Sequence, residues 1–491
     1  MSFGRDQENF EASALVRRLW QYCNILRDDG LSYPDYVEQL TYLLFLKMSD
    51  EQTNGPVPKK HSWSSFAALE PKAMHRKYGE TLSALSGTSG MLGLIFSNAR
   101  NKIKDPAKLR LLVSGLIGQT SWTGLSADLK GDAYEGLLEK NARDTKSGAG
   151  QYFTPRALVR AIVECVNPRL GEVVADPACG TAGFLLAAHQ YLKEHNPHLT
   201  PAETEHLNKK AIRGGELVEE VARLAGMNLL LHGISGSSDA DLPIVCGDSL
   251  EKIPDTKVDI VLTNPPFGVK GSITYSAKEK RSGDNNDDLT VFRSDFWVPT
   301  ANKQLNFVQH VYMMLKSGGR AALVLPDNVL FEGGAAALIR RKLMELCDVH
   351  TILRLPPGLF YAHGVKSNVV FFDVLNRREQ PKGSLWVYDL RTDVRFSLRS
   401  KPIQESDLLE FVDLYQAGQL EKRQEHEGLI RWRRFSHEEI LSSQDCSWHF
   451  SWSASPEAST PPMQRLSEIS QLIEKDLMRA LESVRNAVED L

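Results

Sequence analysis

The 491-residue sequence lacks several features that would assign it to common protein classes. It has no run of about 18 uncharged apolar residues, so we expect no membrane-spanning helix. The first residues, MSFGRDQENFEAS, lack the apolar stretch of a signal peptide. The six cysteines are far apart, with no CxxC pair and no nearby histidine cluster, which argues against disulfides and a zinc site. These absences predict a cytoplasmic, reduced protein without a bound metal.

The sequence also lacks the strongly basic balance of a protein that grips nucleic acid alone, since its formal net charge is −4. Basic residues cluster locally at Lys59-Lys60, at Arg76-Lys77 and between Arg100 and Arg110. Each cluster fits either a solvated surface or a contact with phosphate groups. If the substrate is DNA, part of the phosphate contact must come from these clusters or from a partner.

Helical periodicity dominates residues 1–145. Apolar residues recur at helical spacing from Leu15 to Leu26, and Tyr36 to Met48 forms a second apolar segment. Between them, the run from Ser32 to Asp35, with a proline inside, is typical of a helix start. The pattern predicts an all-helical N-terminal domain.

Residues 146–380 show a different pattern, in which short apolar strands alternate with helices. The predicted strands are 172–175, 211–215, 244–246, 258–263, 321–325, 351–355 and 368–374. The predicted helices are 158–166, 183–194, 218–232, 305–315 and 335–346. This alternation predicts an α/β domain built on a parallel, doubly wound sheet.

Two polar or irregular segments accompany this sheet. Residues 271–300 form a long polar stretch, which we expect to be a mobile loop beside the substrate. Residues 381–491 form a looser C-terminal tail with one strand-like run at 385–390. Within the tail, residues 462–491 carry an apolar stripe typical of an amphipathic helix. Packing on its own chain or docking on a partner subunit would each bury that stripe.

The candidate ligand site lies at the carboxyl ends of the predicted strands, where open α/β sheets bind ligands. The first strand leads into Asp-Pro-Ala-Cys-Gly-Thr-Ala-Gly at residues 176–183, whose small residues allow a ligand close to the backbone. The sequence contains neither GxGxxG nor the GxxxxGKS/T pattern, which argues against NAD and ATP.

Acidic residues end three successive strands, at Asp176, Glu216 and Asp248. A carboxylate after the second strand can accept hydrogen bonds from both ribose hydroxyls of an adenosyl group. Taken alone, Glu216 also fits an ordinary acid stabilised by a helix dipole. Three acids at one sheet edge favour the adenosyl site.

The fourth strand ends in Asn264-Pro265-Pro266-Phe267. Prolines cannot continue a central strand, because they donate no backbone hydrogen bond, so the tetrapeptide is at least a rigid turn. The amino group of an aromatic base is a poor nucleophile, because its lone pair is delocalised into the ring. The Asn264 carboxamide oxygen and the Pro265 carbonyl can each accept one amino hydrogen, which frees the lone pair for methylation. Phe267 offers a face for stacking a flipped base.

Together these motifs resemble the amino-group DNA methyltransferases, and closely resemble the modification subunit (HsdM) of type I restriction-modification systems. Residues 150–156, GQYFTPR, look like that family's N-terminal motif for S-adenosyl-L-methionine (AdoMet), and DPACGTAGF at 176–184 looks like its AdoMet loop. Residues 317–334 and 353–372 resemble its downstream blocks. The motif order is that of the gamma class of N6-adenine enzymes, and the resemblance covers essentially the whole chain.

The resemblance implies a Rossmann-like AdoMet-dependent methyltransferase sheet that methylates N6 of adenine in double-stranded DNA. It implies a catalytic role for Asn264, Pro265, Pro266 and Phe267. The implied cofactor-binding residues are Gln151, Tyr152, Phe153, Thr154, Pro155, Arg156, Asp176, Cys179, Gly180, Thr181, Ala182, Glu216 and Asp248. Phe360 aligns with a position where related enzymes stack the target base from its other face, although a core phenylalanine is the common alternative.

Gamma-class enzymes that act alone carry a sizeable target-recognition domain after the Phe360 block. The tail at 381–491 is too small for one, so the resemblance implies a separate specificity subunit (HsdS) with two copies of this chain per complex. It also implies a motor and restriction subunit (HsdR), because this chain has no Walker A or obvious nuclease motif.

Two other functions stay open at this point. One is methylation of RNA or of protein glutamine, where similar tetrapeptides occur; the upstream block at 151–156 and the large helical domain argue against it. The other is an assembly subunit without activity that places its partner on DNA. The intact tetrapeptide and glycine-rich loop argue against that one.

Overall fold

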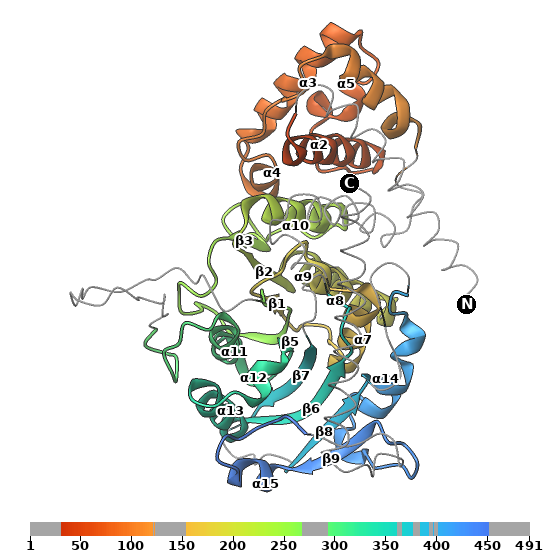
Figure 1. Cartoon of the computed structure of the whole chain (residues 1–491). Coiled ribbons are helices and arrows are strands. Elements are labelled where there is room, and N and C mark those ends of the chain that lie inside the picture. The colour runs from red at the N-terminus through yellow and green to blue at the C-terminus, as the bar shows by residue number, and fades with distance from the viewer. Residues whose placement is uncertain are drawn as a thin grey trace, which may run out of the picture. The chain divides into compact units, whose positions relative to one another are not determined.

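The computed structural model describes residues 31–120, 122, 154–267, 293–360, 366–376, 383–391, 396 and 401–450 (Figure 1). The elements named below belong to one structural unit that ends at Trp448. Several predictions lie outside the described residues. These are Gln151, Tyr152 and Phe153, most of the 271–300 loop, the 462–491 helix and the boundaries near 145 and 380.

The described part of residues 31–122 contains helices and no strand. The helices are α2 (Tyr33–Glu51), η1 (Lys59–His61), η2 (Trp63–Ser65), α3 (Pro71–Ser86), α4 (Gly90–Ile95), α5 (Pro106–Leu112) and η3 (Val113–Ile117). A proline in the first turn begins α2, α3 and α5, where its missing N–H costs no helical hydrogen bond. The helix start predicted between Ser32 and Asp35 is therefore confirmed.

Nine strands of the described residues form one sheet in the order β3-β2-β1-β4-β5-β7-β6-β8-β9. They are β1 (Val174–Asp176), β2 (Ile212–Glu216), β3 (Ile244–Cys246), β4 (Val258–Thr263), β5 (Leu315–Pro326), β6 (Cys347–Leu355), β7 (Ser367–Val374), β8 (Ser384–Asp389) and β9 (Trp432–Ser436). All seven strands predicted within 146–380 are present, and β3 and β4 have the predicted bounds. The sheet continues beyond residue 380 through β8 and β9.

The predicted α/β fold with helices on both faces of a sheet is confirmed, whereas the sheet is mixed and not parallel as predicted. Strand β7 lies between β5 and β6 and is antiparallel to both, and β9 is antiparallel to β8. Parallel neighbours need a long crossover, usually a helix, whereas β6 and β7 are separated only by residues 356–366. The short connection therefore returns the chain antiparallel, into the space beside β5.

Helices cover the sheet on both sides. They are α7 (Arg156–Val166), α8 (Gly183–His195), α9 (Pro201–Lys209), α10 (Glu219–Leu231), α11 (Lys303–Met314), α12 (Asp327–Phe331), α13 (Ala335–Leu346), η5 (Glu405–Asp407), α14 (Leu409–Tyr415), η6 (Leu420–Lys422) and α15 (His437–Ser442). In Figure 1, α11, α12 and α13 lie on one side of the strands, and α7 and α14 on the other. Among the described residues, no helix is long and apolar enough to cross a membrane.

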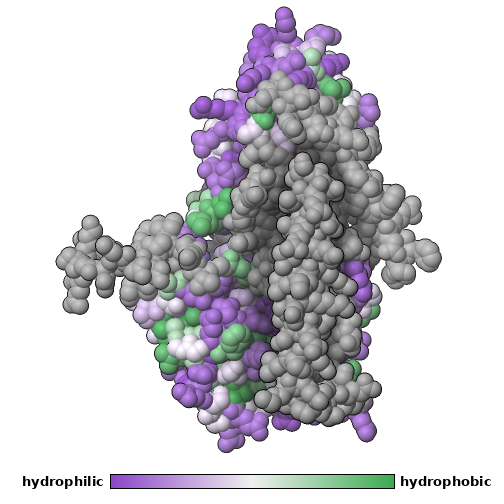
Figure 2. All heavy atoms as spheres, in the orientation of Figure 1, coloured by the Kyte–Doolittle hydropathy of each residue, from purple (hydrophilic) through white to green (hydrophobic). Residues whose placement is uncertain are grey.

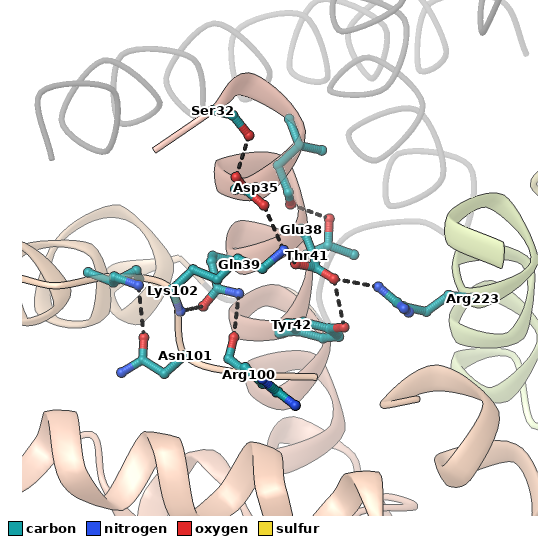
Figure 3. A network of polar contacts seen from close by, with 12 residues as sticks. Ser32, Asp35, Glu38, Gln39, Thr41, Tyr42, Arg100, Asn101, Lys102 and Arg223 are labelled. Carbon is teal, nitrogen blue, oxygen red and sulfur yellow. Dashed lines mark hydrogen bonds and ion pairs between the residues drawn. The ribbon is translucent and has the colours of Figure 1, made fainter. Parts of the chain in front are cut away.

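Helix α10 belongs to two hydrophobic cores. Its Ala222, Ala225 and Leu229 are buried in the core of the sheet, whereas Leu224 and Met227 are buried with the N-terminal helices. A polar network reinforces this contact, since Arg223 of α10 donates to Glu38 of α2 at 2.6 Å (Figure 3). The N-terminal helices α2 and α4 are thus packed directly on α10.

Candidate functional site

Parallel pairing brings the carboxyl ends of β1, β2, β3 and β4 to one edge of the sheet. Asp176 pairs with Gly214, and Glu216 pairs with Cys246. Backbone hydrogen bonds connect the residues that follow these ends: Cys179 N donates to Gly215 O at 2.9 Å, and Gly247 N donates to Glu216 O at 2.8 Å. The structure therefore brings together the strand ends that the sequence predicted to form the site.

The loop after β1 is held tightly over this edge. The Asp176 carboxylate accepts the Ala178 N–H at 3.0 Å, and Ser249 Oγ donates to the Pro177 carbonyl at 2.6 Å. Gly180 and Ala182 have φ values of 55° and 71°. The left-handed region is unfavourable for alanine, so the fixed conformation at Ala182 stores strain, as is common at functional sites.

Two buried carboxyl groups face this loop. Asp176 is 2% exposed and Glu216 is 4% exposed. Burial raises the pKa of Asp176 to about 7. Burial also raises the pKa of Glu216, although the backbone N–H groups of Val218 and Gly180 oppose the shift. Burying two acids side by side is unfavourable for folding, and such pairs are typical of ligand sites.

Glu216 has acceptor capacity left for such a ligand. One oxygen accepts Gly180 N at 3.0 Å and the other accepts Val218 N at 2.9 Å. An ionised carboxylate has about four lone-pair positions, so each oxygen can accept another hydrogen. A ligand with two adjacent hydroxyl groups, such as the ribose of an adenosyl group, fits this arrangement.

Asn264 follows β4 at the same edge. Its Nδ2 donates to Thr154 Oγ1 at 2.9 Å, which fixes the orientation of the amide. Its Oδ1 is buried and, within the described part of the chain, has no hydrogen-bond partner. A buried acceptor without a partner is unfavourable unless a ligand supplies the donor. Behind it, Gln304 of α11 donates to the Pro266 carbonyl at 3.3 Å and braces the tetrapeptide.

One pocket connects the loop with Asn264. Its lining residues are Thr154, Arg156, Val159, Asp176, Ala178, Cys179, Thr181, Gly183, Phe184 and Asn264. Six of the residues predicted for the site thus share one cavity. Pro155 lies beside it as the residue that precedes α7. Asp248 lies at the same edge, half-buried, and accepts Leu250 N at 2.9 Å.

Phe267 and Phe360 contact each other directly. Their ring centroids are 5.6 Å apart and their planes meet at 89°, an edge-to-face arrangement of two buried rings. The sequence predicted that these residues flank a base from opposite faces. The structure brings both side chains together, and a base would enter between them only after the rings separate.

Sequence reasoning missed several polar side chains that support the site. Thr154 was predicted as a cofactor residue, and its bond to Asn264 was not foreseen. Asn228 of α10 donates to the Thr181 carbonyl at 3.0 Å, and Gln304 holds Pro266. Single polar residues inside helices give no sequence signal of this kind. Among the described residues, no group of three or more His, Cys, Asp or Glu side chains could hold a metal ion.

Comparison with known families identifies both parts of the chain. Residues 125–446 match the family model for N-6 DNA methylases, and residues 15–56 match that of the HsdM N-terminal domain. The methylase subunit of the type I restriction enzyme StySPI from Salmonella potsdam is 39% identical, with 89% of this chain and 87% of that protein covered. The EcoKI methylase subunit from Escherichia coli is 38% identical over the same shares of the two chains.

Solved structures agree with this result. The crystal structure of the EcoKI M protein covers 95% of this chain and 96% of its own, with 33% identity and a TM-score of 0.54. A Vibrio vulnificus protein described as a type I modification subunit covers 87% and 92%, with 26% identity and a TM-score of 0.68. With the buried acids and the tetrapeptide at one sheet edge, these matches show that the chain belongs to the N-6 DNA methylases, among the methylase subunits of type I restriction enzymes.

Proposed function

We propose that this chain transfers the methyl group of AdoMet to N6 of adenine in double-stranded DNA. In this proposal it is the modification subunit of a type I restriction-modification complex. The observation that carries the proposal is the orientation of Asn264, whose Nδ2 is held by Thr154 while Oδ1 is buried and has no hydrogen-bond partner among the described residues. That oxygen is placed to accept a hydrogen from an exocyclic amino group.

The chemistry needs no strong base. Asn264 Oδ1 and the Pro265 carbonyl accept the two amino hydrogens and draw the nitrogen toward a tetrahedral form. The lone pair, no longer delocalised, can then attack a methyl group, and the proton leaves afterwards. Gln304 and the two prolines hold these acceptors still, so little reorganisation is needed in the transition state. Phe267 and Phe360 would stack on the flipped base.

AdoMet fits the acidic edge, the sheet edge that carries Asp176, Glu216 and Asp248 next to this tetrapeptide. When bound, it supplies an activated methyl group there. Glu216 would bind the ribose hydroxyls with its remaining lone pairs, and Asp248 the adenine amino group. Residues 176–183 would pack against the amino-acid portion, with Asp176 facing its ammonium group. Thr154, Pro155 and Arg156 would contact the cofactor from the side of α7. Burial raises the pKa of Asp176, and a positive group beside its carboxylate would lower that pKa again.

The proposed partners are the other subunits of a type I restriction-modification complex. The relatives named above are subunits of type I restriction enzymes, and a 25% identical structure from a study of type I complex assembly covers 97% of this chain with a TM-score of 0.67. We therefore propose that two copies bind one specificity subunit (HsdS), which selects the DNA site, and that HsdR joins for restriction. The predicted helix at 462–491 would dock on a partner. A DNA substrate also makes a cytoplasmic location the natural proposal.

The basic clusters of the N-terminal helices are candidates for phosphate contacts. Lys59, Lys60 and Arg76 are exposed, and the face of these helices seen in Figure 2 is mainly hydrophilic. Lys102 differs, because it forms ion pairs with Asp35 and Glu38 at 2.6 and 2.7 Å. We therefore assign DNA contact to the first group and fold stabilisation to Lys102.

The test is methyl transfer by the purified chain with its specificity subunit. Tritiated AdoMet and duplex DNA should yield labelled N6-methyladenine. Asn264→Ala should abolish transfer while AdoMet affinity, measured by calorimetry, stays near that of the wild type. Label in RNA or protein but not in DNA would refute the proposal. Loss of AdoMet binding by Asn264→Ala would contradict the role given to Asn264.

A further inference from the structure

Arg391, in the turn that follows β8, joins the ends of two other strands. Its Nε donates to the Leu355 carbonyl at 2.9 Å, and Nη2 donates to the Ser367 carbonyl at 3.0 Å. Leu355 is the last residue of β6 and Ser367 is the first of β7. Residues 356–366, which include Phe360, connect these two strands. One guanidinium therefore holds both ends of the segment that carries Phe360.

The guanidinium is itself fixed by acidic and amide groups. Arg391 forms two hydrogen bonds with the Asp327 carboxylate, at 3.1 and 2.5 Å, and one with Asn368 Oδ1 at 3.0 Å. Asn368 Nδ2 donates to the same carboxylate at 2.8 Å. The side chains of Arg391 and Asp327 are only 12% and 19% exposed. Burial would raise the pKa of Asp327, but the bonds from Arg391 and Asn368 outweigh it and lower that pKa.

This cluster lies at the functional edge of the sheet. Strand β5 runs parallel to β4, with Leu323 opposite Thr263, so both strands end on the side of Asn264. Asp327 follows β5 directly, and its N–H donates to the Lys366 carbonyl at 3.0 Å, which adds a third attachment to the segment. Phe360, which belongs to this segment, makes the edge-to-face contact with Phe267.

We propose that Arg391 is a positioning residue for methyl transfer: by holding the two ends of 356–366 together, it sets the place of Phe360 opposite Phe267. This rests on the proposed function, in which the two rings stack on the target base. Arg391 need not touch the substrate. Its effect is on the distance between the rings once a base has entered, and thus on how well the base is held beside Asn264.

The chain contains a matched control for a purely stabilising guanidinium. Arg320 donates to both oxygens of Glu172 at 2.7 and 2.8 Å, and to the carbonyls of Val166 and Asn167, each at 2.8 Å. Arg391 likewise binds one carboxylate and two backbone carbonyls, and in addition the Asn368 side chain. Arg320 lies toward the opposite edge of the sheet, so replacing it removes similar bonds far from Phe360.

The experiment uses the complex with the specificity subunit and two duplexes of the same sequence. One contains the target adenine and gives kcat; the other carries 2-aminopurine in its place, which has no N6 amino group and reports only the flipping of the base. Sequencing of methylated host DNA identifies that adenine beforehand. The variants are Arg391→Gln, Arg391→Lys, Phe360→Ala, the double variant Arg391→Gln/Phe360→Ala, and Arg320→Gln. Each is measured for kcat, for AdoMet affinity, for melting temperature and for the rise in 2-aminopurine fluorescence as the base leaves the stack.

We expect Arg391→Gln to lower kcat by about 100-fold, as a misplaced side chain of the site does, and to reduce the fluorescence rise. AdoMet affinity should stay unchanged. In the double variant the loss of kcat should be no greater than in Phe360→Ala alone, because both changes remove the same function, the placing of the Phe360 ring against the base. Arg391→Lys, which keeps the charge beside Asp327 but cannot span both carbonyls, should fold normally and still lose kcat. Arg320→Gln should lower the melting temperature and keep kcat.

Additive losses in the double variant would overturn the proposal, as would wild-type kcat in Arg391→Gln. Equal loss of kcat in Arg320→Gln would also overturn it, because general destabilisation would then explain both variants. If Arg391→Gln does not fold, Arg391→Lys carries the same test. A wild-type complex that methylates no adenine refutes the proposed function instead, and this is seen before any variant is made.

Discussion

Replacing Asp176 by asparagine should stabilise the protein while removing its affinity for AdoMet. Asp176 is 2% exposed, and burial raises its pKa from 3.8 to about 7. Asparagine keeps an oxygen for the Ala178 N–H, which is 3.0 Å from the carboxylate, but carries no charge. The variant therefore removes the unfavourable buried charge and retains the bond that shapes the loop.

The magnitude follows from the shifted pKa. Each pKa unit corresponds to about 1.4 kcal/mol, so a change from 3.8 to about 7 corresponds to about 4 kcal/mol above pH 7. Between these two values the folded state keeps a proton that the unfolded state has released, so wild-type stability falls as the pH rises. At pH 5 the unfavourable contribution is only about 2 kcal/mol, and below 3.8 it disappears.

The assay is urea unfolding of wild type and Asp176→Asn without AdoMet, at pH 8 and pH 5, followed by tryptophan fluorescence. The variant should be more stable at both pH values, with the larger gain at pH 8. Calorimetry at pH 8 should show no AdoMet binding by the variant. Asp248→Asn, a half-buried acid at the same edge, should show no such gain in stability. A variant less stable than wild type at pH 8, or a gain independent of pH, would refute the reasoning.

Three further changes test the supporting contacts. Thr154→Val should lower kcat by about tenfold, because Asn264 Nδ2 is left buried without an acceptor, whereas Thr154→Ser should keep activity. Arg223→Met should lower the unfolding free energy by about 3 kcal/mol in urea titrations, because it breaks the pair with Glu38; an unchanged midpoint would contradict this. Gly214→Ala should cost about 1–3 kcal/mol, since its Cβ would lie 2.6 Å from the Ile244 side chain; the melting temperature checks it.

Local patterns were sufficient for most strands and helices. Strand β4 was predicted with its observed bounds because Val258–Thr263 is a short apolar run between polar turns. Helix α9 was missed, although Thr200, Pro201 and Glu203 form the complete start signal, and the structure has the corresponding capping box. The missed helix is a polar one, with Leu207 as its buried residue, so hydrophobic periodicity was a poor guide there.

Strand direction and order could not be obtained from local patterns. Strand β7 is as apolar as the parallel strands of the sheet, and no local feature of Ser367–Val374 indicates that it inserts between β5 and β6. That choice depends on pairing between segments far apart in the chain and on the short connection at 356–366. Local sequence specifies a strand, whereas its place in the sheet depends on the other strands.

The candidate site shows the same difference between residues that local patterns predict and contacts that they do not. Asp176, Glu216 and Asn264 were predicted because each ends or directly follows a strand, and the carboxyl ends of parallel strands meet at one edge. The contact of Thr154 with Asn264 joins residues 110 positions apart, and Gln304 reaches Pro266 from another helix. Such supporting contacts depend on tertiary structure. They carry no pattern of their own, although they determine whether the reacting groups are held in place.

Helix α10 shows how closely the site is tied to the N-terminal helices. It begins directly after Val218, whose N–H binds Glu216, and its Asn228 holds the Thr181 carbonyl of the β1 loop. On its other side, Arg223 pairs with Glu38, and Met227 is buried with the N-terminal helices. Moving those helices against the sheet would expose apolar side chains and leave a buried guanidinium without its carboxylate, which is unfavourable by several kcal/mol. The sheet edge that carries Asp176 and Glu216 and the N-terminal helices are therefore positioned by the same helix, α10.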